Sequence, residues 1–131
     1  MVPDKTLLEE LQQVLRSDPE LAVEGKFFTC SLLLATSEHR FLLRFRDGEL
    51  VDLIPNPMPV DAWQFAIKAP DHTWERFLQD PPPPEFHDIW AATWLGHMMI
   101  EGDIKVLMQN HRALWRTFKL LREIANERAA A

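Results

Sequence analysis

The chain has 131 residues, of which 47% are hydrophobic and 26% are charged, with a formal net charge of −6. This length and composition are typical of a folded globular protein with one core, so we expect residues 1–131 to form a single domain. The acidic balance excludes the clustered basic face that nucleic-acid binders usually carry, and we expect no nucleic-acid partner. The single cysteine, Cys30, excludes an internal disulfide bond and a cysteine-based zinc site.

The N-terminal stretch does not resemble a signal peptide. Acids and glutamines interrupt the apolar run that a signal peptide needs, as the sequence MVPDKTLLEELQQVL shows. The longest apolar stretches of the chain are only a few residues, too short to span a membrane. We therefore expect no integral membrane segment and a cytoplasmic location.

An amphipathic helix is predicted first. Leucine and valine residues recur at helical spacing and form one apolar face. Asp4 or Thr6 can cap the start of this helix. The helix should end near Ser17, because Pro19 disfavours the helical conformation at Asp18.

Three strands in a meander are predicted next. Residues 27–36 are rich in aliphatic and aromatic side chains and predict a buried strand. Residues 40–46 alternate, with phenylalanine and leucine on one side and arginine on the other. Asp47-Gly48 is a strong hairpin signal, because glycine accepts the positive φ of a tight turn, and residues 49–54 complete the meander.

A fourth strand is predicted over residues 62–69, after a proline-rich segment that cannot join a sheet. Its alternation places three apolar residues on one face: Trp63, Phe65 and Ile67. A short helix follows to about Gln79, with Asp71 or Thr73 as its cap.

The segment after the proline spacer 81–84 predicts a helix over about 85–98 with a bulky apolar stripe. The stripe residues recur every fourth position: Phe86, Trp90, Trp94 and Met98. Residues 99–108 predict the last strand, in which Gly102 indicates a bulge or a close backbone approach. A final helix, capped by Asn110, follows, and the tail 126–131 is expected to fray.

This order of elements predicts an α+β fold with a mostly antiparallel five-stranded sheet covered on one face by helices. Three segments resemble the sterol carrier protein type two (SCP-2-like) domains in order and spacing: RFRDGELVDL, AWQFAIKAPDHTWERFL and MMIEGDIKVLMQNHRALWRTFKLL. The matching positions are Asp47-Gly48, Asp71 with Trp74, and Gly102-Asp103-Ile104. The resemblance covers roughly residues 5 to 125.

The resemblance implies a hydrophobic tunnel between sheet and helices that binds fatty acids, acyl-CoA, sterols or similar lipids, and it implies no catalytic set. The chain departs from the family in PPPPEFHDIWAATWLGH, which is longer and more aromatic, so the family does not indicate the ligand. We expect a hydrophobic small molecule or lipid as the partner, together with a lipid-metabolising enzyme.

The residues themselves leave two interpretations open: a ligand cavity or a well-packed core. The cavity interpretation uses the three residues of the fourth strand, the four stripe residues, and a facing set on the final helix. The complete set of predicted ligand-binding residues is Trp63, Phe65, Ile67, Phe86, Trp90, Trp94, Met98, Leu114, Trp115 and Phe118.

An enzymatic alternative rests on His97, which borders the stripe and is placed to act as a general acid or base on a bound lipid. The other histidines are dispersed, without the spacing of metal ligands, and no nucleotide or cofactor fingerprint is present. We therefore expect no catalytic set, no metal and no cofactor. A third alternative is an interaction domain whose core is filled by tryptophan and phenylalanine.

Overall fold

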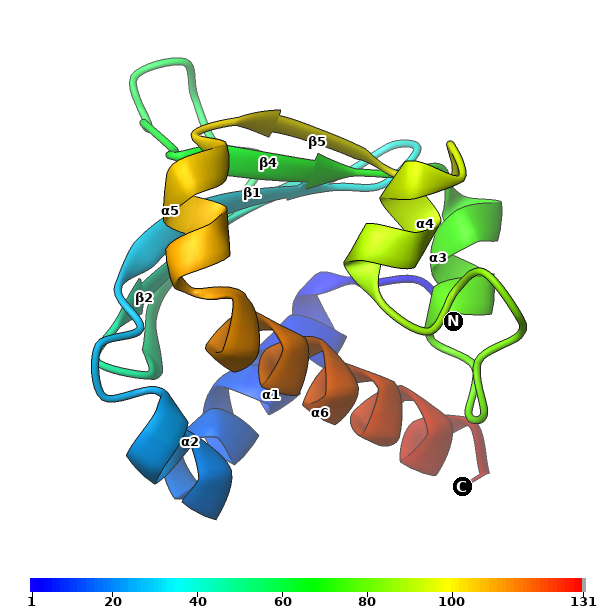
Figure 1. The fold of residues 1–131 in the computed structure, drawn as a ribbon, viewed down its shortest axis with the longest axis horizontal. Helices are drawn as coiled ribbons and strands as arrows, with labels where there is room; N and C mark the ends of the chain where they lie inside the picture. Colours follow the sequence, from blue (N-terminus) through cyan, green and yellow to red (C-terminus); the bar gives the residue numbers. More distant parts are fainter. Residues whose placement is uncertain (131) are drawn as a thin grey trace.

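A curved sheet with helices packed on one face forms the fold of residues 1–130, which the computed structural model describes (Figure 1). In this part of the chain the sheet has five strands in the order β3-β2-β1-β4-β5. The strands are β1 (Cys30–Ala35), β2 (Arg40–Arg46), β3 (Glu49–Pro55), β4 (Phe65–Lys68) and β5 (Met99–Gly102). Among the described residues, three neighbouring pairs are antiparallel, and the central pair β1 and β4 is parallel. The predicted α+β class is confirmed, with a mixed sheet.

The helices lie against the concave face and at one end of the sheet (Figure 1). They are α1 (Lys5–Ser17), α2 (Pro19–Glu24), α3 (Asp71–Phe77), α4 (Ile89–Trp94), α5 (Ile104–Gln109) and α6 (His111–Ala130). Helices α1 and α6 pack on each other, and α1 also packs on β3. In the described residues, no helix combines the length and the apolar character needed to cross a membrane.

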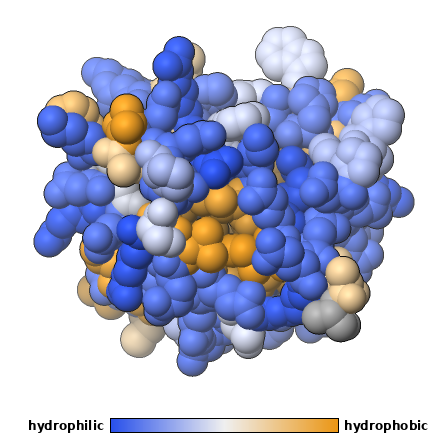
Figure 2. Space-filling view, turned by 90° about the horizontal axis from the view of Figure 1, so that it is seen from below, coloured by the Kyte–Doolittle hydropathy of each residue, from blue (hydrophilic) through white to orange (hydrophobic). Residues whose placement is uncertain are grey.

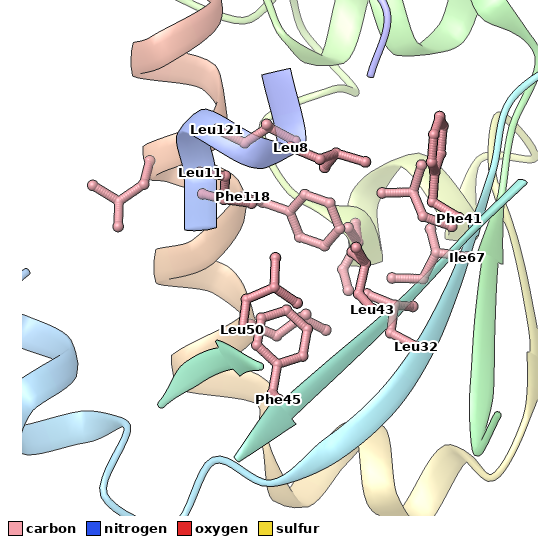
Figure 3. Packing of buried hydrophobic residues seen from close by; sticks show 14 of the residues in the cluster. Leu8, Leu11, Leu32, Phe41, Leu43, Phe45, Leu50, Ile67, Phe118 and Leu121 are labelled. Carbon is pink, nitrogen blue, oxygen red and sulfur yellow. The ribbon is translucent and has the colours of Figure 1, made fainter. Parts of the chain in front are cut away.

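The core lies between the sheet and the pair α1 and α6. Figure 3 shows leucines of α1 and apolar residues of α6 meeting side chains from the inner face of the sheet. The labelled residues, all at most 5% exposed, are Leu8, Leu11, Leu32, Phe41, Leu43, Phe45, Leu50, Ile67, Phe118 and Leu121, several of them fully buried. Burial of this apolar area is the main stabilising contribution to the fold.

The outer side of the helical layer is mostly hydrophilic. Figure 2 shows the face on which α2 and the C-terminal end of α6 lie, with one apolar depression in its middle.

Asn126 anchors the C-terminal end of α6, since its side-chain amide donates to the carbonyls of Leu78 and Arg122, both at 2.7 Å. The tail predicted to fray is therefore helical through Ala130, and residue 131 lies outside the described residues.

Asp18 and Pro19 end α1 and also begin α2. Asp4 caps α1 as predicted, accepting from the Leu7 amide at 2.7 Å, and α1 ends at Ser17. Asp18 then caps α2, a helix that the sequence did not indicate, by accepting from the Leu21 amide at 3.2 Å. Proline is favoured at the first position of a helix, so Pro19 ends one helix and begins the next.

The aromatic stripe does not form the predicted helix over 85–98. Helix α4 has six residues, because the proline run before it lacks amide donors and Asp88 caps the helix only at Ile89. Gly96, with φ +85°, then ends it, and the amides of Gly96 and His97 donate back to the last turn. Phe86 and Met98 therefore lie outside the helix.

The last strand is shorter than predicted. Strand β5 ends at Gly102, and Asp103 caps α5 by accepting from the Val106 amide at 3.2 Å. The close backbone approach predicted at Gly102 is confirmed: φ is +94°, and a Cβ there would lie 2.6 Å from the Gln64 carbonyl oxygen. Only glycine fits this position without displacing the neighbouring strand.

The predicted cap of the helix over 71–79 is wrong. Pro70 occupies the N-cap position of α3 and provides no side-chain cap. The Asp71 carboxylate instead accepts from the Ser37 amide at 3.0 Å, and the Asp71 amide donates to Ser37 Oγ at 2.8 Å. Asp71 therefore ties α3 to the loop between β1 and β2.

Candidate functional site

His111 begins α6 at a sharp corner of the chain. A single residue, Asn110, separates α5 from α6. The Asn110 side-chain amide donates to the Val106 carbonyl at 2.8 Å, and its own carbonyl accepts from the Leu114 amide at 3.0 Å. This residue closes one helix and opens the next, which fixes His111 at the surface beside α4.

Several hollows share His111 in their walls. Two surface clefts, of about 360 and 430 Å³, have Glu24 and Arg112 in common. A third cleft, of about 410 Å³, is lined by Trp90, Met108 and His111. An inner hollow of about 10 Å³ also has His111 in its wall. The clefts have the size of small-molecule sites, whereas the inner hollow is nearly filled.

The inner hollow is mostly aromatic. Its walls include Phe77, Trp90, Trp115 and Phe118. The rings of Trp90 and His111 lie 5.9 Å apart, centroid to centroid, at an angle of 43°. Both rings belong to the wall of the inner hollow and to that of the 410 Å³ cleft. This ring pair therefore separates the surface from the interior.

Arg122 lines this hollow and is only 9% exposed. Its Nε donates to the Phe77 carbonyl at 2.9 Å and its Nη2 to the Phe86 carbonyl at 3.2 Å. The guanidinium also lies over the Phe77 ring, 5.0 Å from its centroid. Burial lowers the pKa of Arg122 from its ordinary value, an effect that Asp80 and Asp88 partly offset.

A buried ion pair lies beside the 360 Å³ cleft, whose lining includes Arg116. Arg116 donates to both carboxylate oxygens of Asp18, at 2.8 and 3.1 Å, and its Nε lies 3.4 Å from Glu20. These hydrogen bonds lower the pKa of Asp18 and raise the pKa of Arg116. Bidentate pairing of this kind fixes α6 against the start of α2.

Asp88 adds an acidic group to the lining of both the 360 Å³ cleft and the inner hollow. Its Oδ1 accepts from the Ala91 amide at 2.7 Å, and its Oδ2 lies 3.6 Å from His87 Nε2. The cleft therefore has an apolar interior and a rim of mixed charge, an arrangement suited to an amphipathic molecule.

The structure brings together three of the ten predicted ligand-binding residues, Trp90, Trp115 and Phe118, at the inner hollow. The fully buried residues Phe65, Ile67 and Leu114 belong to the core.

The remaining predicted residues are dispersed. Trp63 precedes β4 and contacts Gly102. Phe86 is buried and stacks on His97, with ring centroids 4.5 Å apart. Met98 lines a separate cleft at the other side of α4.

The prediction that Trp94 lines an internal cavity is wrong. Its side chain is 90% exposed. Helix α4 buries Ile89 and Ala92, so the row of Trp90 and Trp94 is turned partly outward. Trp94 is also the last residue of the helix, beyond the part that packs on the core. The recurrence of large apolar residues at every fourth position correctly predicted an α-helix here, but it did not predict which face of the helix is buried.

His97 lies in that separate cleft, which has a volume of about 570 Å³. Its Nε2 is 2.9 Å from the Glu85 carboxylate, and its ring stacks on Phe86. The imidazole is thus held on both its edge and its face. It lines neither the inner hollow nor the clefts that share His111.

Cys30 is a free thiol packed in the core. It is 5% exposed, and burial raises its pKa to about 12. A thiol of this kind is a poor nucleophile at neutral pH. Among residues 1–130, no group of three or more histidine, cysteine and acidic side chains is placed to hold a metal ion.

The sequence reasoning missed Arg122, His111 and Met108. A signal for Arg122 was present: it lies seven residues after Trp115 and four after Phe118, which is the spacing of one helical face. A charged residue at an apolar-face position indicates a buried ionic group. His111 and Met108 carry no such local signal, since their place depends on the corner between α5 and α6.

Solved structures with the same fold include several sterol carrier proteins. A conserved hypothetical protein of Thermus thermophilus, described as a candidate sterol carrier protein, matches with TM-score 0.73 and 17% identity over 95% of this chain and 90% of that chain. A sterol carrier protein 2 matches with TM-score 0.73 and 18% identity, over 92% and 96% of the two chains. A UbiJ-SCP2 ubiquinone synthesis protein matches with TM-score 0.55 and 13% identity, also over 92% and 96%.

No protein-family model and no curated protein sequence matches this chain. The structural likeness nevertheless defines the class of fold: the protein has an SCP2-like fold. The fold implied by the sequence resemblance is confirmed.

Proposed function

We propose that this protein binds and carries a hydrophobic small molecule of lipid type. The ligand enters through the clefts at His111 and places its apolar part in the space now occupied by the inner hollow. The observation that carries this proposal is the continuity of the Trp90–His111 wall between a surface cleft and an aromatic interior. Three of the similar structures bear names that refer to sterol carrier proteins, which supports a lipid ligand.

Binding requires side chains to move. The inner hollow of about 10 Å³ is smaller than the tens of cubic ångströms that one ligand segment needs. Trp115 is already 45% exposed and Trp90 is half-buried, so both can swing outward at lower cost than a fully buried ring. We infer that opening of the Trp90–His111 pair accompanies binding.

A partner enzyme is part of the proposal. A carrier of this kind delivers its ligand to an enzyme that makes or modifies a hydrophobic molecule. The name of one similar structure, a ubiquinone synthesis protein, supports such a partner. An enzymatic role for the chain itself would rest on His97, which lies away from the proposed binding space.

The filled state of the inner hollow favours a second candidate, an interaction domain with no ligand. One experiment decides between the two. The protein is purified, denatured and extracted, and the extract is analysed by mass spectrometry for bound lipid, while calorimetry follows titration of the native protein with long-chain fatty acids and alcohols. Bound lipid and saturable heat are expected. A clean extract and no heat with any of these ligands would favour the interaction domain.

A further inference from the structure

Phe27 projects from the loop between α2 and β1, and its side chain is 83% exposed. Backbone hydrogen bonds fix this loop, since the Phe28 amide donates to the Gly25 carbonyl at 2.8 Å and the Gly48 amide donates to the Phe28 carbonyl at 3.0 Å. The Phe28 ring is buried and stacks on Phe45, with ring centroids 4.5 Å apart. The backbone of the loop therefore holds the Phe27 ring in an exposed position.

Met108 of α5 and Trp115 of α6 continue this apolar surface. Met108 is 64% exposed and lines the 430 Å³ cleft together with Phe27 and Arg112. Trp115 is 45% exposed and lines the 360 Å³ cleft, which also has Arg112 in its wall. The three apolar side chains therefore surround the clefts at His111. Large apolar side chains that are exposed together in this way indicate a surface that contacts another molecule or a membrane.

Two lysines stand over the exposed rings. Lys26 Nζ lies 5.6 Å from the centroid of the Phe27 ring, and Lys119 Nζ lies 5.2 Å from the centroid of the Trp115 ring. Within residues 1–130 neither lysine forms an ion pair, not even with Glu123, which follows Lys119 by one turn of α6. These lysines therefore give the apolar surface a local positive charge, although the net charge of the chain is −6.

The acidic residues that line the same clefts have cationic or backbone partners of their own. Glu20 lies 3.4 Å from Arg116 Nε, and Glu24 lies 3.9 Å from Arg112 Nη1. Asp88 caps α4. These acids therefore do not neutralise the two lysines, whose charges are available to an anionic surface.

The entrance face consists of five side chains: Phe27, Met108, Trp115, Lys26 and Lys119. We propose that the entrance face docks on the surface of a bilayer that contains anionic lipids. The apolar side chains enter the boundary between headgroups and acyl chains, while the lysine stems extend their charges toward the phosphates. A bilayer accepts a protruding ring at any place, whereas a protein partner needs a matching pocket. Docking goes beyond the proposed function, because it does not require a ligand in the inner hollow.

Co-sedimentation of the protein with lipid vesicles tests this docking. Vesicles of phosphatidylcholine are compared with vesicles that also contain phosphatidylglycerol, at low and at high salt. At low salt the protein should bind the anionic vesicles at least about 10-fold more tightly than the neutral ones, and salt should reduce this preference. Phe27→Ala and the double variant Lys26→Gln/Lys119→Gln should each weaken binding to the anionic vesicles by about 10-fold.

Trp94→Ala and the double variant Arg40→Gln/Arg76→Gln are the matched controls. Trp94 is 90% exposed, and Arg40 and Arg76 are exposed cations that form no ion pair within residues 1–130. Each control should change vesicle binding by less than about 2-fold.

Three outcomes would overturn the docking. Equal binding to neutral and anionic vesicles at low salt would exclude the role of the lysines. Losses in the controls as large as in Phe27→Ala or in the lysine variant would move the contact to another surface. Binding to neither kind of vesicle would leave the entrance face to a protein partner. None of these outcomes depends on lipid in the hollow, which the mass spectrometry of extracted protein measures separately.

Discussion

Two histidine-bearing clefts lie on either side of α4, and they differ in what is beneath them. The cleft at His97 is the larger, at about 570 Å³, but its histidine is held by Glu85 and by stacking on Phe86. The cleft lined by Trp90, Met108 and His111 is smaller, at about 410 Å³, and shares its wall with an aromatic hollow in the core.

Cleft volume alone therefore does not identify a binding site. A surface depression offers a hydrophobic chain little burial, because most of its contacts remain with water. A cleft that continues into the interior offers both an apolar environment and, at Arg122, a buried charge. The clefts at His111 are therefore the better candidates, and the following variants test that ranking.

The largest effect is expected from Phe118→Ala. Phe118 is 5% exposed and packs on Trp74 and Phe77 as well as on the hollow. Loss of the ring should lower the free energy of unfolding by about 3–4 kcal/mol. Urea denaturation measures this, with Trp94→Ala as a control expected to change stability by less than about 0.5 kcal/mol. A loss below about 1 kcal/mol for Phe118→Ala would mean that the hollow is not part of the core.

The ion pair in the wall of the cleft should show in the pH dependence of stability. The folded-state pKa of Asp18 is lowered, so its contribution is fully present above the unfolded-state value near 3.8 and is lost as pH falls through the folded-state pKa. Asp18→Asn should cost about 2–3 kcal/mol at neutral pH and reduce this acid dependence.

Asp52→Asn provides the control for that measurement. Asp52 pairs with Arg44 at 3.6 Å, but both side chains are more than a third exposed. Exposed pairs of this kind contribute less than about 1 kcal/mol. Thermal unfolding from pH 2 to 7 compares the two variants. Equal losses of stability would show that the Asp18–Arg116 pair contributes no more than an exposed pair.

The two tryptophans of α4 lie in different environments, so they distinguish binding in the hollow from binding at the surface. Trp90 lines the hollow, whereas Trp94 is 90% exposed. Trp90→Ala should weaken the binding of a long-chain ligand by about 10-fold, through lost aromatic contact area. Trp94→Ala should leave the affinity unchanged. Calorimetric titration of both variants tests the assignment, and a larger effect of Trp94→Ala would move the site to the outer surface.

The histidines should have the smallest effects. His97→Ala removes a partly exposed hydrogen bond to Glu85 and a ring stack on Phe86, and should cost about 1 kcal/mol of stability without changing ligand affinity. His111→Ala should change the free energy of unfolding by less than about 0.5 kcal/mol. It should also speed ligand association, because one of the two rings at the entrance is removed. Stopped-flow fluorescence measures the rates. Faster association in His97→Ala alone would reverse the ranking of the two clefts.

Local signals predicted the N-terminal half well. The cap at Asp4, the alternation in β2 and the turn at Asp47-Gly48 each depend on residues close together in the chain. The segment from 81 to 111 was harder, because its backbone follows prolines at one end and Gly96 in the middle rather than the apolar spacing. Prolines and glycines of this kind shorten a helix even when apolar residues recur at helical spacing.

The candidate site was only partly predictable. Trp90, Trp115 and Phe118 were identified from apolar periodicity, which marks burial. The face that α4 turns inward, and hence the exposure of Trp94, depends on contacts with distant elements. The meeting of Trp90 with His111 likewise requires the corner at Asn110, a tertiary feature that spacing within one segment does not encode.

The indole N–H signals of the five tryptophans report whether a ligand enters the hollow beside Trp90 and Trp115. They are assigned with single Trp→Phe variants and followed by nitrogen–proton NMR as a long-chain ligand is added. Trp90 and Trp115 should shift, whereas Trp94 should not, and Trp74 should stay fixed because its indole donates to the Ala35 carbonyl at 3.0 Å. Shifts at Trp94 with none at Trp90 and Trp115 would show that the ligand binds on the outer surface and not in the hollow.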